Sequence, residues 1–263
     1  MASVWDAVTG HPHAVEILRR SAEHPVHAYF FLGSGGDGKE TVARAFAARL
    51  LSGSDDASER TNELVMRGVH PDVHEVRRSR ASILVAEADD VIVKASTTGV
   101  EGQRKVIIMH EVNLMSPAAV VRLLKTVEEP ADGVFLILLA DAMVDLLVTL
   151  ASRSLTVHFG ALNENDIRDA LLRAGIDQER AATAARSAHG SLERAQLLAT
   201  DTQLVHRRER FANVPRRIDG TGATVAAIVD ELLGLIDDAA EPLYRRSEEH
   251  TSELQSQFRI SYA

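Results

Sequence analysis

The chain has 263 residues, of which 45% are hydrophobic and 25% charged, a composition typical of a globular protein with one large α/β domain and a smaller helical one. It contains no cysteine, which excludes disulfides and thiolate metal sites, and no apolar run of the about 18 residues needed to span a membrane. The formal net charge of -9 argues against a protein that grips DNA by itself, and we expect a cytoplasmic protein without a membrane partner.

The amino-terminal part alternates short apolar runs with segments of helical periodicity. After an amphipathic segment over Val4–Leu18, buried strands are predicted over His27–Leu32, Val73–Val76, Val106–Met109, Val134–Leu139 and Leu155–Phe159. Helices are predicted between them over Glu40–Leu51, Val85–Ala95, Ser116–Pro130 and Leu146–Ala151, with Ser116 as an N-cap. Strands that alternate with helices predict an α/β domain with a parallel sheet flanked by helices over residues 1–160.

The pattern changes after Gly160, where no further strand is predicted. Asn163 is typical of a helix N-cap, and alanine- and arginine-rich helices follow it. We expect a small helical lid domain over residues 161–205. Residues 206–245 are expected to hold a linker, with a polar stretch at Arg216–Gly222, and the start of a truncated helical domain at Val225–Ile236.

The last residues match a laboratory sequence. Arg246–Ser256 is the in-frame translation of a common sequencing-library adapter, and Ile260–Ala263 matches the adapter's next segment after three residues that a barcode could encode. Two matches in one frame favour an artefact over a polar helix or a flexible tail. We therefore exclude residues 246–263 from the fold and expect the authentic chain to be cut short near residue 245.

A glycine-rich loop runs from Gly33 to Gly38 between a predicted strand and a predicted helix, and Lys39 follows it. This is the setting of a Walker A loop, in which backbone N–H groups bind a phosphate and the lysine neutralises its charge. The next residue should be a Ser or Thr that holds Mg²⁺, but it is Glu40, and Asp37 adds a second carboxylate. The sequence therefore predicts a P-loop-type fold without tight binding of Mg-ATP.

The residues that follow the strand Val106–Met109 also argue against tight binding of Mg-ATP. A working site would have an Asp that holds the metal, followed by a catalytic Glu, whereas this chain has His110 followed by Glu111. Histidine is a poor ligand for a hard cation that prefers oxygen. We therefore interpret these two residues, with Gly33, Gly38 and Lys39, as a degenerate nucleotide site, and we expect no cofactor and no bound metal.

His70 and His74 have the spacing of a zinc-binding pair on a helix. However, Pro71 lies between them and the segment enters a strand, so the two side chains would not share a helix face. The sequence therefore predicts no metal site there.

The stretch Lys105–Pro130 resembles bacterial DNA polymerase III clamp-loader subunits of the AAA+ family. Their distinctive signature matches Leu123–Pro130, and Leu147–Ser154 is similar to the family's Ser-Arg-Cys motif, with Ser154 in the Cys place. Trp5–His11, His27–Tyr29 and His70–Val73 resemble further family segments, so the likeness covers about residues 4–205. Many relatives also carry a four-cysteine zinc module, in whose place this chain has Ser52–Met66.

The resemblance implies a role in a ring that places a clamp on DNA. In this family gamma/tau subunits hydrolyse ATP and keep both Walker motifs, whereas delta-prime subunits carry degraded motifs and act as stators. Glu40 and His110 therefore favour the delta-prime branch, with gamma/tau and delta subunits as partners, and the beta sliding clamp and primer-template DNA reached through the complex. Such a subunit belongs to DNA polymerase III without being catalytic alone. The alternative is an ATP-hydrolysing motor subunit of the gamma/tau type.

Arg153, in the Ser-Arg-Cys-like motif, is the residue to which the resemblance assigns a catalytic role. In the family this arginine acts as a finger in trans, reaching a neighbour's ATP, where a guanidinium neutralises charge that develops on the γ-phosphate. The alternative is an ordinary surface salt bridge. Arg194 lies near the family's lid arginine, which contacts nucleotide in active relatives, but a structural role is favoured here.

Overall fold

The computed structural model describes residues 2–78, 81–200 and 202–236. The chain divides into two compact units, Met1–Ala199 and a second unit that begins at Thr200. The segment predicted to derive from an adapter, 246–263, lies outside the described residues, as do residues 237–245. In the part that is described, no helix is long and apolar enough to cross a lipid bilayer.

A five-stranded sheet forms the centre of the first unit. Its strand order is β2 (Val73–Val76), β3 (Lys105–Met109), β4 (Val134–Ala140), β1 (Ala28–Leu32) and β5 (Leu155–His158). All neighbours pair in parallel, which confirms the predicted parallel sheet. The carboxyl ends of all five strands therefore lie at one edge, where open sheets of this kind bind ligands.

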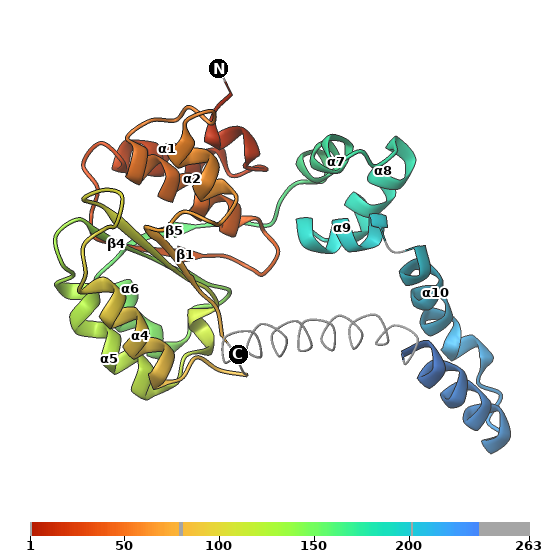
Figure 1. Ribbon diagram of the computed structural model, residues 1–263. Helices are drawn as coiled ribbons and strands as arrows, with labels where there is room; N and C mark the ends of the chain where they lie inside the picture. Colours follow the sequence, from red (N-terminus) through yellow and green to blue (C-terminus); the bar gives the residue numbers. More distant parts are fainter. Residues whose placement is uncertain (1, 79–80, 201, 237–263) are drawn as a thin grey trace, which may run out of the picture. The chain divides into compact units, whose positions relative to one another are not determined.

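Helices cover both faces of this sheet (Figure 1). On one face lie α1 (Pro12–Ser21) and α2 (Lys39–Ser52), and on the other lie α4 (Val85–Ala95), α5 (Pro117–Glu128) and α6 (Val148–Ala151). Alternate side chains of β1 pack against the helices on opposite faces of the sheet. Tyr29 and Phe31 belong to the same core cluster as residues of α2, whereas Phe30 belongs to the cluster that includes α5. Near-continuous apolar strands are what a sheet buried on both faces requires.

Two predicted helix starts are confirmed in atomic detail. The hydroxyl of Ser116 accepts a hydrogen bond from the backbone N–H of Ala119 at 3.3 Å. The side chain of Asn163 likewise accepts one from the backbone N–H of Asp166 at 2.8 Å. Each cap satisfies one of the N–H groups that a helix leaves without a partner in its first turn.

Several short elements were not predicted. These are the helix α3 (Arg60–Met66) and the 3₁₀ turns η1 (Val4–Ala7), η2 (Val112–Leu114) and η3 (Asp145–Leu147). Buried Asn62 fixes α3 by donating to the carbonyls of Ser54 and Asp56 at 3.1 and 2.8 Å. The opening amphipathic segment is divided into η1 and α1 because Gly10 and His11 both have positive φ.

The helices after the sheet have a core of their own. It is formed by α7 (Glu164–Arg173), α8 (Gln178–Ser187) and α9 (Leu192–Thr200), whose buried side chains include Ile167, Leu171 and Ala195. The boundary expected at residue 205 falls inside α10 (Thr202–Arg217), a helix where a linker was expected. In the second unit, Arg217 of α10 pairs with Glu231 of a helix over 222–236 at 2.6 Å.

Asp72 closes the loop that leads into β3. Its buried carboxylate accepts hydrogen bonds from the backbone N–H groups of Val100, Glu101 and Gly102, the last two at 2.9 and 3.2 Å. We expect Asp72→Ala to lower the free energy of unfolding by on the order of 2–3 kcal/mol, because the N–H groups lose a charged acceptor. Chemical denaturation measures this, with Asp90→Ala, which removes an exposed ion pair to Lys94, as the control. An equal, small loss in both variants would contradict the role of Asp72.

Candidate functional site

The loop Gly33–Gly38 connects β1 to the N-terminus of α2, as predicted, at the carboxyl edge of the sheet. Gly36 and Gly38 have φ of 78° and 91°, values that glycine adopts without strain. A Cβ on Gly33 would lie 2.6 Å from Cβ of Phe159, so a side chain has no room there. The backbone of a P-loop is therefore present.

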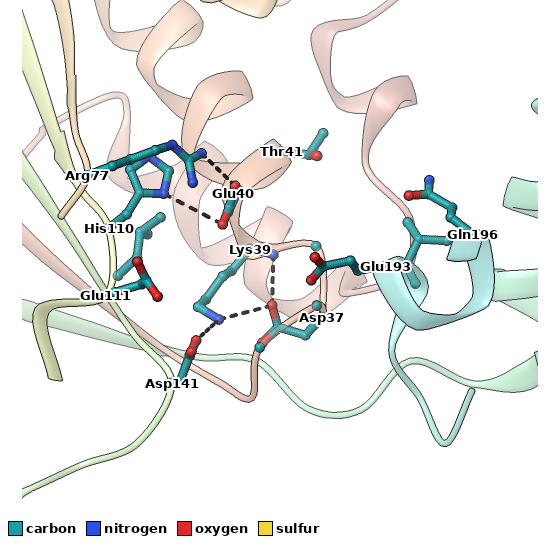
Figure 2. A pocket seen from close by; sticks show the side chains of 15 residues that line it. Asp37, Lys39, Glu40, Thr41, Arg77, His110, Glu111, Asp141, Glu193 and Gln196 are labelled. Carbon is teal, nitrogen blue, oxygen red and sulfur yellow. Dashed lines mark hydrogen bonds and ion pairs between the residues drawn. The ribbon is translucent and has the colours of Figure 1, made fainter. Parts of the chain in front are cut away.

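The ammonium group of Lys39 is buried and points toward Asp141 and Asp37 (Figure 2). It donates to the carbonyls of Gly33 and Ser34 at 3.0 and 3.2 Å and to the carboxylate of Asp141 at 2.7 Å. A buried ammonium requires such partners, because transfer of an unpaired charge out of water is costly. Lys39 is thus already neutralised within the chain.

Asp37 places a carboxylate inside the loop. Its Oδ1 accepts a hydrogen bond from the backbone N–H of Lys39 at 2.9 Å and lies 3.5 Å from the ammonium of Lys39. Burial raises the pKa of the Asp37 carboxyl, although Lys39 acts against this shift. The carboxylate of Asp37 therefore accepts a hydrogen bond from the N–H group of Lys39, a backbone group that binds phosphate in a P-loop.

Glu40 and His110, the two positions where the sequence predicted a missing metal ligand, lie next to each other. Nδ1 of His110 is 3.6 Å from Oε1 of Glu40, the distance of an ion pair rather than a hydrogen bond. Arg77 donates to Glu40 from the other side at 2.8 Å. His110 and Arg77 together lower the pKa of Glu40 to about 2, so Glu40 carries a full negative charge at neutral pH.

Glu75 on β2 completes this cluster around His110. Nε2 of the buried imidazole lies 3.2 Å from Oε2 of Glu75, which also accepts from Arg44 at 2.9 Å. Burial raises the pKa of Glu75, but His110 and Arg44 outweigh burial and lower it to about 2. Burial lowers the pKa of His110, yet Glu40 and Glu75 raise it above the usual 6.5.

Glu111, which occupies the position of a catalytic glutamate, is held by its own ion pair. Arg78 donates to its carboxylate at 2.9 Å. The backbone of Glu111 has a φ of 51°, which costs energy for a residue with a side chain. The strand end therefore turns sharply here and presents Glu111 to the same edge of the sheet as the loop.

The helix α9 docks directly onto the loop. The backbone N–H of Leu192 donates to the carbonyl of Gly36 at 2.8 Å. A Cβ on Gly36 would collide with the hydroxyl of Ser191 and lie 3.2 Å from Cβ of Glu193. Glycine at this position thus allows the close approach of the helical domain, a contact that the sequence analysis did not predict.

A cavity of about 460 Å³ lies between the loop and α9, within the size range of small-molecule sites. Its charged lining comprises the acidic residues Asp37, Glu40, Glu111, Asp141 and Glu193 and the basic residues Lys39, Arg77 and His110. Gln196 also lines it, whereas the exposed Arg194 does not. Among the described residues, no group of three acidic or histidine side chains could hold a metal ion.

Arg153 lies at the opposite edge of the sheet. It comes immediately before β5, so it is placed at the amino ends of the strands, whereas Lys39 is at their carboxyl ends. A strand of five residues separates these edges by roughly 15 Å. Arg153 is 38% exposed and forms an ion pair with Glu128 of α5. It therefore takes no part in the cavity beside Lys39.

Sequence reasoning assigned no role to Asp141, Glu75 or Arg77, whose side chains pair with Lys39, His110 and Glu40 respectively. Asp141 immediately follows β4, and the carboxyl ends of neighbouring parallel strands meet at one edge. This position could have identified it as a partner for Lys39. Arg77 follows β2 in the same way, whereas Glu75 lies within β2 and carries no comparable signal.

We expect the cluster around His110 to give the protein a pH-dependent stability. The raised pKa of His110 means that its stabilising charge is fully present below pH 6.5 and is lost as the pH rises through the folded-state pKa. The lowered pKa values of Glu40 and Glu75 mean that their contribution is present above pH 4.5 and is lost toward about 2. Stabilisation by the cluster should therefore be greatest between pH 4.5 and 6.5.

His110→Gln should remove the fall in stability on the alkaline side. At about pH 6 it should lower the free energy of unfolding by on the order of 2 kcal/mol, because Glu75 loses a charged partner. The difference from the natural sequence should shrink as the pH rises toward about 9, which melting experiments at a series of pH values measure. His13→Gln, at an exposed position of α1, is the control. A difference that does not change with pH would contradict the ion pairing of His110.

Comparisons with known proteins relate the chain to DNA polymerase III subunits and agree with the fold. A family model described as "DNA polymerase III, delta subunit" matches residues 10–163. The DNA polymerase III subunit delta' of Bacillus subtilis is 29% identical over 208 residues, covering 76% of this chain and 63% of the relative. That of Pseudomonas aeruginosa is 33% identical over 139 residues, 50% of this chain and 42% of the relative. The tau subunit of Escherichia coli is 28% identical over 250 residues, 88% of this chain and 36% of the relative.

The chain thus spans less than two thirds of the length of these curated relatives. Among solved structures, two RuvB variants of Thermotoga maritima share the fold, with TM-scores of 0.51 and 0.52 at 16% identity. They cover 85% and 80% of this chain, and 70% and 65% of their own chains are matched. Because the family model covers more than half of the residues, the chain belongs to the DNA polymerase III delta subunit family.

Proposed function

We propose that this chain is the stator of a DNA polymerase III clamp loader and does not hydrolyse ATP itself. In this role it would help to open the beta sliding clamp and place it on primed DNA, beside gamma/tau and delta subunits. Its delta-prime relatives and the resemblance of Leu123–Pro130 to the clamp-loader signature support this assignment.

The observation that carries the proposal is the ion pair between Glu40 and His110. In a working P-loop enzyme these two positions hold Mg²⁺ through a hydroxyl and a carboxylate. Here the imidazole of His110 and the carboxylate of Glu40 pair with each other, so these two positions offer neither the hydroxyl nor the aspartate. The residues present do not fit Mg²⁺, because Mg²⁺ prefers oxygen ligands in octahedral geometry and a buried imidazole cannot supply them. We infer that this chain binds no Mg-ATP.

The loop itself supports the same conclusion. A nucleotide would have to displace Asp37 from the N–H of Lys39 and Asp141 from its ammonium. It would also bring several negative charges into a cavity that already holds Asp37, Glu111, Asp141 and Glu193. Like charges at such distances repel strongly when water is excluded.

In this proposal, Arg153 is the residue that takes part in catalysis. Because it lies at the edge of the sheet opposite Lys39, it cannot reach the cavity beside Lys39, and a nucleotide that it contacts would belong to a neighbouring subunit. Its guanidinium remains charged at any physiological pH and can neutralise charge on a γ-phosphate in the transition state. In the proposed ring, Arg153 acts as an arginine finger in trans on an adjacent gamma/tau subunit.

A motor subunit that hydrolyses ATP is the second candidate. The tau subunit of Escherichia coli covers 88% of this chain, and the cavity beside Lys39 retains Glu111 in the catalytic position. The two candidates differ in a property that the isolated chain should display, namely the affinity for Mg-ATP.

Calorimetry should detect no binding of Mg-ATP to the chain at nucleotide concentrations of about 1 mM. The triple variant Asp37→Ala, Glu40→Thr and His110→Asp should gain binding, because it frees the N–H of Lys39 and restores a hydroxyl and a carboxylate for Mg²⁺. Adding Lys39→Ala to the triple variant should abolish the gain. Micromolar binding by the natural sequence would instead support the motor subunit.

Replacing Arg153 by Ala should slow hydrolysis at the one site that Arg153 faces. In a reconstituted clamp loader whose other ATP sites are disabled, we expect a loss of about 10³-fold or more. Arg122→Ala is a matched control, since Arg122 is another exposed arginine in an ion pair, with Asp89 at 3.1 Å. An ATPase rate unchanged by Arg153→Ala would refute the trans-acting role.

A further inference from the structure

The side chain of Arg153 is held from two elements. Its Nε donates to Oε1 of Glu128, and its Nη1 donates to the carbonyl of Thr149 at 2.9 Å and to the hydroxyl of Ser152 at 3.3 Å. Thr149 and Ser152 belong to the turn of α6 that carries Arg153, whereas Glu128 lies in the last turn of α5. Glu128 is therefore the only one of these partners that ties Arg153 to another helix.

These contacts leave one arm of the guanidinium fork available. In the described part of the chain, Nε and Nη1 have partners and Nη2 has none. A planar fork held at two of its nitrogens has a defined direction, so that its third nitrogen points along a fixed line. A long, unrestrained arginine would instead lose conformational entropy when it binds a phosphate.

The ion pair contributes little to folding stability, since Arg153 and Glu128 are 38% and 44% exposed. The neighbouring side chains Val148 and Leu155 are exposed apolar groups, 53% and 37% respectively. Burial of this surface against a neighbouring protein would exclude water and strengthen the pair. We therefore expect the ion pair between Arg153 and Glu128 to fix the position of Arg153 more firmly in an assembled complex than in the isolated chain.

We propose that Glu128 is a positioning residue for Arg153, which directs Nη2 toward the γ-phosphate of a neighbouring subunit's ATP. This inference rests on the proposed trans-acting role of Arg153 and adds the residue that orients it. The acceptor atom matters more than the charge, because a carboxylate that is too strongly paired would also neutralise part of the guanidinium charge. An amide that keeps the acceptor should therefore preserve the function.

The test uses the full chain in the reconstituted clamp loader whose other ATP sites are disabled, with clamp and primed DNA present. Glu128→Ala should lower kcat for ATP hydrolysis by about tenfold and leave KM nearly unchanged, because a misdirected finger acts on the transition state only. Glu128→Gln should retain most of the rate. Glu128→Ala combined with Arg153→Ala should be no slower than Arg153→Ala alone, since Glu128 acts through Arg153.

Glu129→Ala is the matched control, because Glu129 is the next residue, is exposed, and makes no side-chain ion pair among the described residues. Melting temperatures of all variants should agree, which excludes a folding defect as the cause. Glu128→Ala with an undiminished kcat, beside an Arg153→Ala variant that loses activity, would overturn the positioning role while the proposed function stands. So would a double variant that is slower than Arg153→Ala. An Arg153→Ala variant with full activity would overturn both.

Discussion

The ammonium group of Lys39 is buried, and a buried charge must be neutralised by groups that the fold brings to it. The carboxylate of Asp141 reaches it from the end of β4, and that of Asp37 reaches it from the loop itself. As a result the loop closes on its own side chains and presents the carbonyl of Gly36 to the N-terminus of α9. The pairing of one lysine thereby links the sheet, the loop and the helical domain within the unit Met1–Ala199.

The substitutions at Glu40 and His110 are physically coupled. A lone carboxylate at Glu40 would repel a polyphosphate, and a lone buried imidazolium at His110 would pay the full cost of desolvation. Together they neutralise each other, and Glu75, Arg44 and Arg77 extend the pairing to a network. Changing either residue alone toward a metal-binding type leaves a charge without its partner. A metal-binding pair at these two positions would therefore require simultaneous changes.

The parts of the fold that sequence reasoning identified depend on local rules. Buried strands follow from apolar runs, and the starts of α5 and α7 follow from Ser116 and Asn163, whose caps involve residues only three positions away. The missed features depend on contacts that no local pattern encodes. The partner of Lys39 is 102 positions away in Asp141, and the short helix α3 depends on side-chain hydrogen bonds from Asn62 to the carbonyls of the preceding loop. The site could thus be located from the sequence, but the charge pairing within it could not.

The charged side chains at the two edges of the sheet differ in how far they are buried and paired. At the carboxyl edge, Lys39 and His110 are buried and lie beside carboxylates of the same chain. At the amino edge, Arg153 stays at the surface, with one carboxylate partner and one nitrogen of its fork open. A subunit that bound its own nucleotide would change shape with each cycle, and the direction of a finger on its surface would change with it. In the proposed stator, an internally paired site that binds no nucleotide would remove that source of motion and favour a constant geometry for Arg153 at the other edge.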